Sequence, residues 1–384
     1  MKFQQRLLTA AAVVAAAVVS PSARALVSLE DGKDHIFVDG SVEMGYDSNV
    51  FANGLDNGSL SYEEVVTTEF TRRAGWIGVN VSASVTAMQF ERFTSQNYVD
   101  PSLSAEFTKQ SGRTTGSITL SVQREDRADV NVNTRDISWN YDAGLNFQYP
   151  VIERYSITGT FDYSRANYDD QLLFTNQTVY SSNLYLYYIL NDQRDMFIDY
   201  RYRLTDEANG QKYVDNSLMI GVSGRVFGPF NGSLQVGYQD RTPYGVAGPN
   251  GYNDTNAAGS MTWNITRRIA LTANVSQDFS TTANAISIET SSAGFTLQDS
   301  ISSKAVATLT ATGGENRFLG TAGEQAPDSQ QRVDQFIAMS AFYSYAFNEH
   351  LKLQVGCSYY RNWSNLSFAD FPRTQYNLTV SSHW

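Results

Sequence analysis

The stretch YNLTVSSHW, residues 376–384, decides how this chain is interpreted. Successive residues of a β-strand point to opposite faces of the sheet. One face of this stretch is mostly apolar and carries Tyr376, Leu378, Val380, Ser382 and Trp384. The other face is polar and carries Asn377, Thr379, Ser381 and His383. The stretch predicts an amphipathic strand that ends on an aromatic residue. It is either an edge strand of a secreted β protein or the closing strand of a barrel.

The first 25 residues predict a cleaved secretory signal peptide. Lys2 and Arg6 precede an uncharged and almost wholly apolar run over residues 7–19, and Ala-Arg-Ala at residues 23–25 is an A-x-A-like cleavage site. The apolar run is shorter than the roughly 20 residues that a membrane-spanning helix needs. An uncleaved anchor is the alternative.

The composition excludes several classes of protein. Without residues 1–25, 25 basic residues stand against 39 acidic ones, a net charge of −14, so a basic surface for nucleic acid is absent. Tyr, Phe and Gly are abundant while Pro is scarce, which fits a wall with one face in lipid and the other in water. The single cysteine, Cys357, excludes an internal disulfide.

Apolar and polar residues alternate along the chain and predict about 18 strands, with a range of about 16–18. The longest regular examples run from Trp76 to Ala87 and from Ile137 to Tyr149. The alternation is weak around residues 286–297 and 303–311. We expect an all-β, transmembrane, antiparallel up-and-down barrel at residues 35–384, after a short periplasmic segment at residues 26–34.

The connections between these strands are of two kinds. Tight turns centre near residues 74, 111, 152, 193, 228, 267, 300 and 348. The alternate connections are often longer and rich in Asn, Asp and Gly, as at 47–61, 168–178, 205–213, 241–254 and 312–332. Short periplasmic turns and longer extracellular loops are typical of outer-membrane barrels. We expect a periplasmic aromatic girdle at the short turns, formed by Phe70, Trp76, Phe107, Tyr149, Tyr155, Phe230 and Phe347.

The competing all-β interpretations are a secreted sandwich and a propeller. A propeller would repeat a blade motif, and no such motif recurs in the sequence. A sandwich of this length would need two or three domains joined by linkers, and no linker is visible. Evenly spaced strands suit a closed barrel, in which every backbone group can be paired within lipid.

If the apolar parity faces lipid, the other parity faces an aqueous lumen. The lumen-facing candidates are Asp39, Glu43, Asp142, Asp162, Asp199, Arg201, Arg203, Asp215, Arg225, Lys352 and Arg373. Mixed charges suit a diffusion channel, although each of these residues could simply keep the wall wetted. The acidic excess suggests cation preference or divalent ions at the outer rim. The segment Gly313–Gln331 either folds inward as a constriction or lies outside.

The sequence offers little catalytic chemistry. The three histidines are His35, His350 and His383, and none is expected near the extracellular rim. No zinc-protease motif, cysteine cluster or nucleophile elbow occurs. We therefore expect no enzyme activity, no cofactor and no metal centre.

Two segments resemble known outer-membrane barrels. The strand with Tyr376, Leu378, Val380 and Trp384 is similar to the C-terminal signal that barrel-assembly machinery reads. The segment Tyr46-Asp47-Ser48-Asn49-Val50-Phe51 resembles a family of outer-membrane β-barrel porins that includes barrels of exopolysaccharide and capsule loci. A turn cluster is the simpler interpretation of its Asp-Ser-Asn core. The resemblance implies location and fold more than substrate.

Three functions follow from these observations. The first is a porin-like channel of the Gram-negative outer membrane for small hydrophilic solutes. The second is a barrel for exopolysaccharide export or surface attachment, and the third is a structural or adhesive barrel with an occluded lumen. The expected partners are outer-membrane lipid, lipopolysaccharide and the assembly machinery. The oligomeric state does not follow from the sequence.

Overall fold

The computed structural model describes residues 27–29, 33–55, 57–73, 75–245, 251–319 and 331–384. The predicted signal peptide, residues 1–25, lies outside these residues. No helix in the described ranges is long and apolar enough to cross a membrane.

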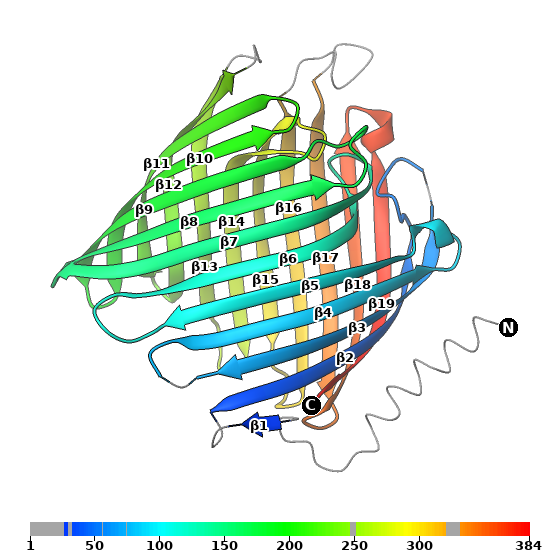
Figure 1. Ribbon diagram of the computed structural model, residues 1–384, viewed down its shortest axis with the longest axis horizontal. Coiled ribbons are helices and arrows are strands. Elements are labelled where there is room, and N and C mark those ends of the chain that lie inside the picture. Colours follow the sequence, from blue (N-terminus) through cyan, green and yellow to red (C-terminus); the bar gives the residue numbers. More distant parts are fainter. Residues whose placement is uncertain (1–26, 30–32, 56, 74, 246–250, 320–330) are drawn as a thin grey trace.

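Eighteen antiparallel strands form a closed barrel (Figure 1). They are β2 (Asp34–Asp47), β3 (Ser59–Arg72), β4 (Gly78–Phe90), β5 (Tyr98–Lys109), β6 (Thr115–Asp129), β7 (Thr134–Ile152), β8 (Tyr155–Tyr168), β9 (Gln177–Asn191), β10 (Arg194–Glu207), β11 (Gln211–Phe227), β12 (Phe230–Gly245), β13 (Tyr252–Asn264), β14 (Ile269–Thr281), β15 (Ser287–Asp299), β16 (Ala305–Phe318), β17 (Val333–Ala346), β18 (Leu351–Ser364) and β19 (Phe371–His383). Each strand pairs with the next along the chain, and β19 pairs with β2. The predicted barrel and its strand number are confirmed. A further short strand, β1 (Val27–Leu29), was not predicted and pairs with β2.

The seam between β19 and β2 closes the barrel as predicted. Its register runs from His383 opposite Asp39 to Gln375 opposite Asp47. Trp384 continues the pairing, because its N–H donates to the Val38 carbonyl at 3.0 Å and its carbonyl accepts from Val38 N–H at 2.9 Å. Its indole ring stacks on His350 with 4.7 Å between ring centroids. The seam therefore leaves no free strand edge.

The Trp384→Ala variant is expected to assemble poorly, because it loses the stacking contact on His350 that fixes the end of the seam. The measurement is the fraction of protein in the outer membrane that migrates as the folded, heat-modifiable form on a gel. Trp76→Ala is the matched control, since Trp76 is 83% exposed beside a short turn. Normal assembly of the Trp384 variant would contradict the predicted role of residues 376–384 as an assembly signal.

The barrel has two different ends. All eight tight turns lie at one end, which we call the turn end, together with the start of β2 and the end of β19. The strand register shifts at this end in two places that adjoin a proline or glycine turn. These are Pro150/Ile152 and Arg225/Phe227. The other end, the loop end, carries the alternate connections. The predicted periplasmic location of the turn end agrees with the architecture of outer-membrane barrels.

Several loops at the loop end are shorter than predicted. The expected loop 205–213 is a turn of residues 208–210, and the expected loop 312–332 begins only after β16 ends at Phe318. Both strands flanking the expected loop 241–254 also extend into it, and residues 246–250 lie outside the described residues. These strand ends project beyond the roughly 9–11 residues needed to cross a bilayer. Polar residues occur on both of their faces there, so the alternation that marks a strand disappears while the backbone pairing continues.

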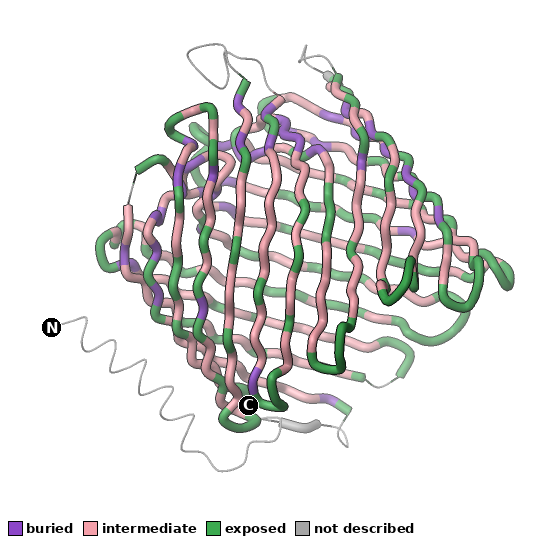
Figure 2. The backbone as a smooth tube through the Cα atoms, turned by 180° about the vertical axis from the view of Figure 1, so that it is seen from behind, coloured by how far each residue is buried: buried purple, intermediate pink, exposed green. Residues whose placement is uncertain are grey.

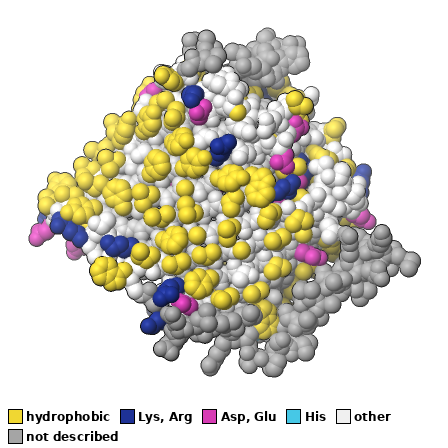
Figure 3. Space-filling model, viewed as in Figure 1, with side chains coloured by type: hydrophobic (Ala, Val, Ile, Leu, Met, Phe, Trp, Pro, Cys, Tyr) yellow, Lys and Arg dark blue, Asp and Glu magenta, His cyan; other side chains and the backbone are white. Residues whose placement is uncertain are grey.

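The outer face of the wall is apolar. Large exposed hydrophobic side chains cover it, and charged side chains lie mainly toward the edges of the face shown (Figure 3). The predicted girdle residues Trp76, Phe107, Tyr155 and Phe347 are exposed near the turn end. An apolar outer band flanked by aromatic side chains matches a wall that faces lipid.

The buried side chains gather at the loop end (Figure 2). Five of the most buried residues lie either in a loop-end connection or at a strand end beside one. They are Val50, Ala52, Phe279, Phe318 and Phe371, each at most 2% exposed. In a barrel of this size the lumen is wide enough to hold water. The packed part of this protein is therefore a cap of inward-folded residues at one end.

Candidate functional site

The inner face of the barrel is the candidate functional site. Arg201 on β10 donates to Asp278 on β14, at 2.9 and 2.7 Å, although three strands separate β10 from β14 around the wall. A contact between strands so far apart in the sheet crosses the interior. The parity of Arg201 therefore faces inward, and the exposed apolar parity, with Ile198, Tyr200 and Tyr202, faces outward.

Ten of the eleven lumen-facing candidates lie on inward positions, as the strand registers place them. They are Asp39, Glu43, Asp142, Asp162, Asp199, Arg201, Arg203, Asp215, Lys352 and Arg373. The exception is Arg225. It lies where the register shifts at the turn end, and its Nε donates to the Gly228 carbonyl at 2.8 Å. Its side chain therefore braces a short turn.

The interior is accessible to water below the cap. Ser104, Glu106, Asn146 and Gln148 occupy inward positions on β5 and β7 and are nevertheless exposed. Hydroxyl, amide and carboxylate groups dominate the neighbouring inward positions. Such a lining replaces part of the hydration shell of a polar solute, as channel walls do.

A network of arginines and carboxylates fills the corner between β10 and β14. Asp215 is 0% exposed and accepts from Arg203 Nε at 2.7 Å and from Arg241 Nη1 at 3.3 Å. Arg203 also reaches Asp278 at 3.1 Å. Arg241 is 0% exposed, donates to Thr281 at 2.5 Å and lies over the Tyr213 ring. Buried charges require such partners, because an unpaired ion in a protein interior costs several kcal/mol.

Sequence reasoning missed Arg241 and Asp278 as members of this network. Both occupy the inward parity of their strands, near the loop end. The prediction placed Arg241 at the start of the loop 241–254 and did not include Asp278 among the lumen-facing candidates. Extending the alternation by a few residues into the polar ends would have found both.

The cap joins opposite sides of the barrel. Arg332, just before β17, donates to the carbonyls of Asn131 at 2.7 Å and Val130 at 3.3 Å in the β6–β7 connection. Asn316 on β16 donates to the Asn131 side chain at 3.4 Å. The β6–β7 and β16–β17 hairpins are almost diametrically placed in the strand order. The β6–β7 hairpin therefore crosses the mouth.

Two further contacts complete the cap. Thr175 N–H in the β8–β9 connection donates to the Ala283 carbonyl in the β14–β15 connection at 2.8 Å. Tyr168, Phe174 and Ala283 pack into a small apolar cluster there. The β8–β9 and β14–β15 connections thus fold toward each other and, with the β6–β7 connection, narrow the mouth.

The segment Tyr46–Phe51 belongs to the cap and forms a turn. Asp47 Oδ1 accepts the Asn49 N–H at 2.9 Å, which is the expected turn cluster. Asp47 also binds Arg373 through two nitrogens, with the shortest distance 2.6 Å. The carbonyl of the fully buried Val50 accepts from Arg135 at 3.4 Å. The segment therefore locks the seam and anchors the β2–β3 loop inside the mouth.

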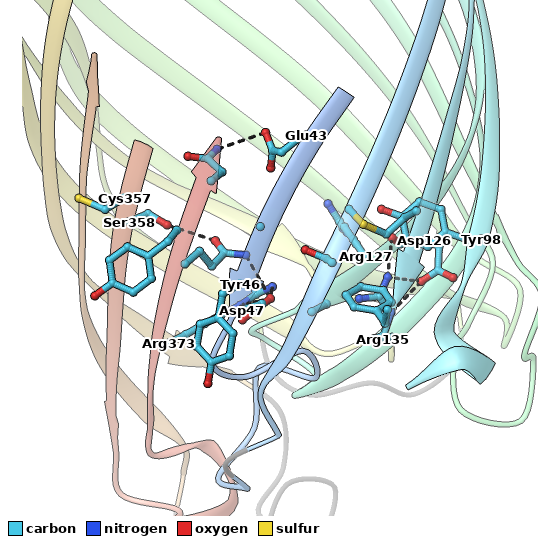
Figure 4. Close-up of a pocket in the computed structure, with 18 of the residues that line it drawn as sticks. Glu43, Tyr46, Asp47, Tyr98, Asp126, Arg127, Arg135, Cys357, Ser358 and Arg373 are labelled. Carbon is cyan, nitrogen blue, oxygen red and sulfur yellow. Dashed lines mark hydrogen bonds and ion pairs between the residues drawn. The ribbon is translucent and has the colours of Figure 1, made fainter. Parts of the chain in front are cut away.

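A cavity of ≈ 350 Å³ lies just inside the cap (Figure 4). Glu43, Asp47 and Arg373 line it from the seam strands, while Tyr98, Asp126 and Arg135 line it from β5–β7. Arg135 donates to Asp126 at 2.7 Å and lies over the rings of Phe90 and Tyr98. Within the narrowed mouth, the arginine side chains are held by carboxylates.

The segment Gly313–Gln331 is not a single loop. Gly313–Phe318 is the end of β16, and residues 320–330 lie outside the described residues. Two described residues of this region reach across the mouth to Asn131, namely Asn316 within the predicted segment and Arg332 one position beyond it.

The histidines lie at the turn end. His350 stacks on Trp384, His35 stacks on Phe37, and the His383 ring is 2.5 Å from Asp39. Their contacts are those of aromatic and polar groups at the barrel seam. Among the described residues, no group of three or more His, Cys, Asp or Glu side chains could hold a metal ion.

Known proteins resemble this chain in sequence and in fold. A sequence model of the family described as "Putative beta-barrel porin 2" matches residues 227–383, which is less than half of the chain and excludes the segment Tyr46–Phe51. No curated protein matches the sequence. The match supports a porin-like barrel family and gives no link to exopolysaccharide or capsule loci.

Solved outer-membrane proteins share the architecture. The crystal structure of Pseudomonas aeruginosa OpdK with vanillate is 10% identical, with a TM-score of 0.50, and the alignment covers 91% of this chain and 99% of that chain. Acinetobacter baumannii OccAB3 is 10% identical, with a TM-score of 0.48 over 91% and 99% of the two chains. The FrpB iron transporter of Neisseria meningitidis is 10% identical, with a TM-score of 0.48 over 85% and 62%. The likeness to OpdK concerns the fold, a closed barrel of the outer-membrane type.

Proposed function

We propose that this protein is a porin-like channel of the Gram-negative outer membrane through which small hydrophilic solutes pass passively. The observation that carries the proposal is the set of inward polar side chains that stay exposed inside a closed barrel, such as Glu106 and Asn146. A solid or purely structural barrel would fill these positions with packed side chains. The cap restricts passage to small solutes, and the match to a porin-like family supports the same role.

Other roles remain as outcomes of the test. Export or attachment of exopolysaccharide rests on the resemblance of the segment Tyr46–Phe51, whose side chains here hold the seam and the β2–β3 loop. A barrel with an occluded lumen would follow if the cap sealed the mouth completely. On the channel proposal, residues 1–25 direct export, the assembly machinery reads the β19 strand, and lipid with lipopolysaccharide surrounds the wall.

Protein refolded into a planar bilayer is expected to give steady single-channel current steps in KCl, because the interior holds water. A protein-free bilayer treated with the same detergent is the control. The absence of steps, together with loss of surface polysaccharide in a deletion strain, would favour the export role. The absence of both effects would favour the occluded barrel.

A further inference from the structure

The wall formed by β2–β9 carries carboxylates with no cation beside them. Six of the described inward acidic residues, spread from the turn end to the cap, have no cation partner, namely Glu43, Glu63, Glu69, Glu106, Asp142 and Asp162. Each is exposed or half-exposed. Glu43, Glu69 and Asp142 receive hydrogen bonds from neutral groups, at 2.7 Å from Thr379, 2.9 Å from Asn80 and 3.2 Å from Ser121. None of the six forms an ion pair within the described residues.

The inward arginines are already neutralised. In the described strands they are Arg127, Arg201, Arg203, Arg241 and Arg373. Their carboxylate partners are Asp136 at 3.5 Å, Asp278 at 2.7 Å, Asp215 at 2.7 and 3.3 Å, and Asp47 at 2.6 Å. Lys352 at the turn end is the one inward Lys or Arg of these strands without an ion pair. The positive charges therefore leave the six carboxylates uncompensated.

A further inward carboxylate, on the strand next to this wall, is buried. Asp199 on β10 is 0% exposed and faces inward beside Tyr185 and Arg201. Neither of its oxygens has a hydrogen bond within 3.5 Å. Because Arg201 lies beside it, Asp199 is not counted with the six carboxylates that have no cation nearby.

In the described strands of the opposite wall, the inward side chains at mid-height carry no compensating charge. The inward residues there are neutral and include Thr272, Asn274, Ser292, Thr310, Ser340 and Ser358. Glu43 and Glu63 even stand directly opposite one another in the β2–β3 register, where like charges destabilise a sheet. Two acids facing each other in this way are tolerated best if cations from solution lie between them.

We propose that the pore prefers cations, so that its solutes are small hydrophilic molecules with a positive charge and inorganic cations. This inference rests on the proposed channel function and specifies its substrate class. The mechanism is electrostatic, because a narrow space lined by one sign of charge raises the local concentration of counter-ions. Anionic solutes meet the same wall as a barrier.

The test is the reversal potential of the refolded protein in a planar bilayer under a KCl gradient. The wild type is expected to pass K⁺ about 10-fold more readily than Cl⁻ near 0.1 M salt. The preference falls near 1 M salt, because the Debye length shortens from about 10 Å to about 3 Å. Glu43→Gln/Glu63→Gln and Asp142→Asn/Asp162→Asn are expected to shift the permeability ratio toward one.

Glu64→Gln is the matched control, since Glu64 follows Glu63 directly on β3 and its side chain lies on the outward face of the wall. It removes one negative charge and is expected to leave the reversal potential unchanged. Two pairs are tested separately so that a folding defect in one leaves the other informative. A current that is unselective or favours Cl⁻ would overturn the cation preference while the channel stands. A silent bilayer would overturn the channel itself, and the inference with it.

Discussion

Replacing Asp215 by asparagine is expected to lower the free energy of unfolding by about 3–5 kcal/mol, the usual cost of leaving a buried charge without its partner. Asp215 and Arg241 are both 0% exposed, and no other carboxylate pairs with Arg241 in the described structure. Asparagine has nearly the same shape, so the loss is electrostatic. Urea-induced unfolding in detergent micelles, followed by tryptophan fluorescence, measures the difference.

Asp206→Asn is the matched control on the same pair of strands. Asp206 pairs with Lys212 at 2.8 Å, and both side chains are 39% exposed. Exposed ion pairs contribute about 0–1 kcal/mol, so this variant is expected to resemble the wild type. Equal stability of the two variants would show that the buried network does not hold the β10–β14 corner together.

Replacing Arg332 by methionine is expected to widen the mouth and raise the single-channel conductance. The guanidinium makes the hydrogen bonds that tie the β6–β7 connection to the opposite wall, at 2.7 and 3.3 Å. It also lies over the Phe318 ring at 4.1 Å and forms an ion pair with Asp334. Methionine keeps an unbranched, flexible side chain of shorter reach and removes every donor. The lost charged hydrogen bonds cost about 1.5–3 kcal/mol each in local stability.

Arg317→Met provides the comparison, because Arg317 is another arginine at the loop end. Its side chain is 49% exposed, and it pairs with Glu289 on the neighbouring strand β15 and with Glu315 on its own strand β16. Its conductance is expected to match that of the wild type. If the Arg332 variant also conducts like the wild type, the contact with Asn131 does not limit passage through the mouth.

The sequence alone predicted the wall of the barrel well. Alternation over stretches such as Ile137–Tyr149 predicts both the strand and the face that meets lipid, because the wall separates an apolar medium from water. The eight short turns and the pairing of residues 376–384 with β2 are also confirmed. Each depends on local composition or on closure of the sheet.

The cap could not be predicted in this way. The contact of Arg332 with Asn131 joins residues 201 positions apart, and neither belongs to a motif. The sequence around 205–213 contains the Asp, Asn and Gly of a loop, yet Thr205–Glu207 and Gln211–Tyr213 pair as strands. One face of these strand ends is buried although it carries polar residues such as Thr205 and Glu207, so residue type no longer reports the direction of the strand. Only the folded chain brings these side chains together.

The facing pair Glu43 and Glu63 couples the passage of cations through the pore to the folding stability of the barrel. Any cation that settles between the two carboxylates lowers their mutual repulsion, and it does so only while β2 and β3 are paired. By thermodynamic linkage, a ligand that binds the folded state alone shifts folding toward that state. The reciprocity is obligatory, so each cation in transit is also a transient stabiliser of the barrel next to its seam.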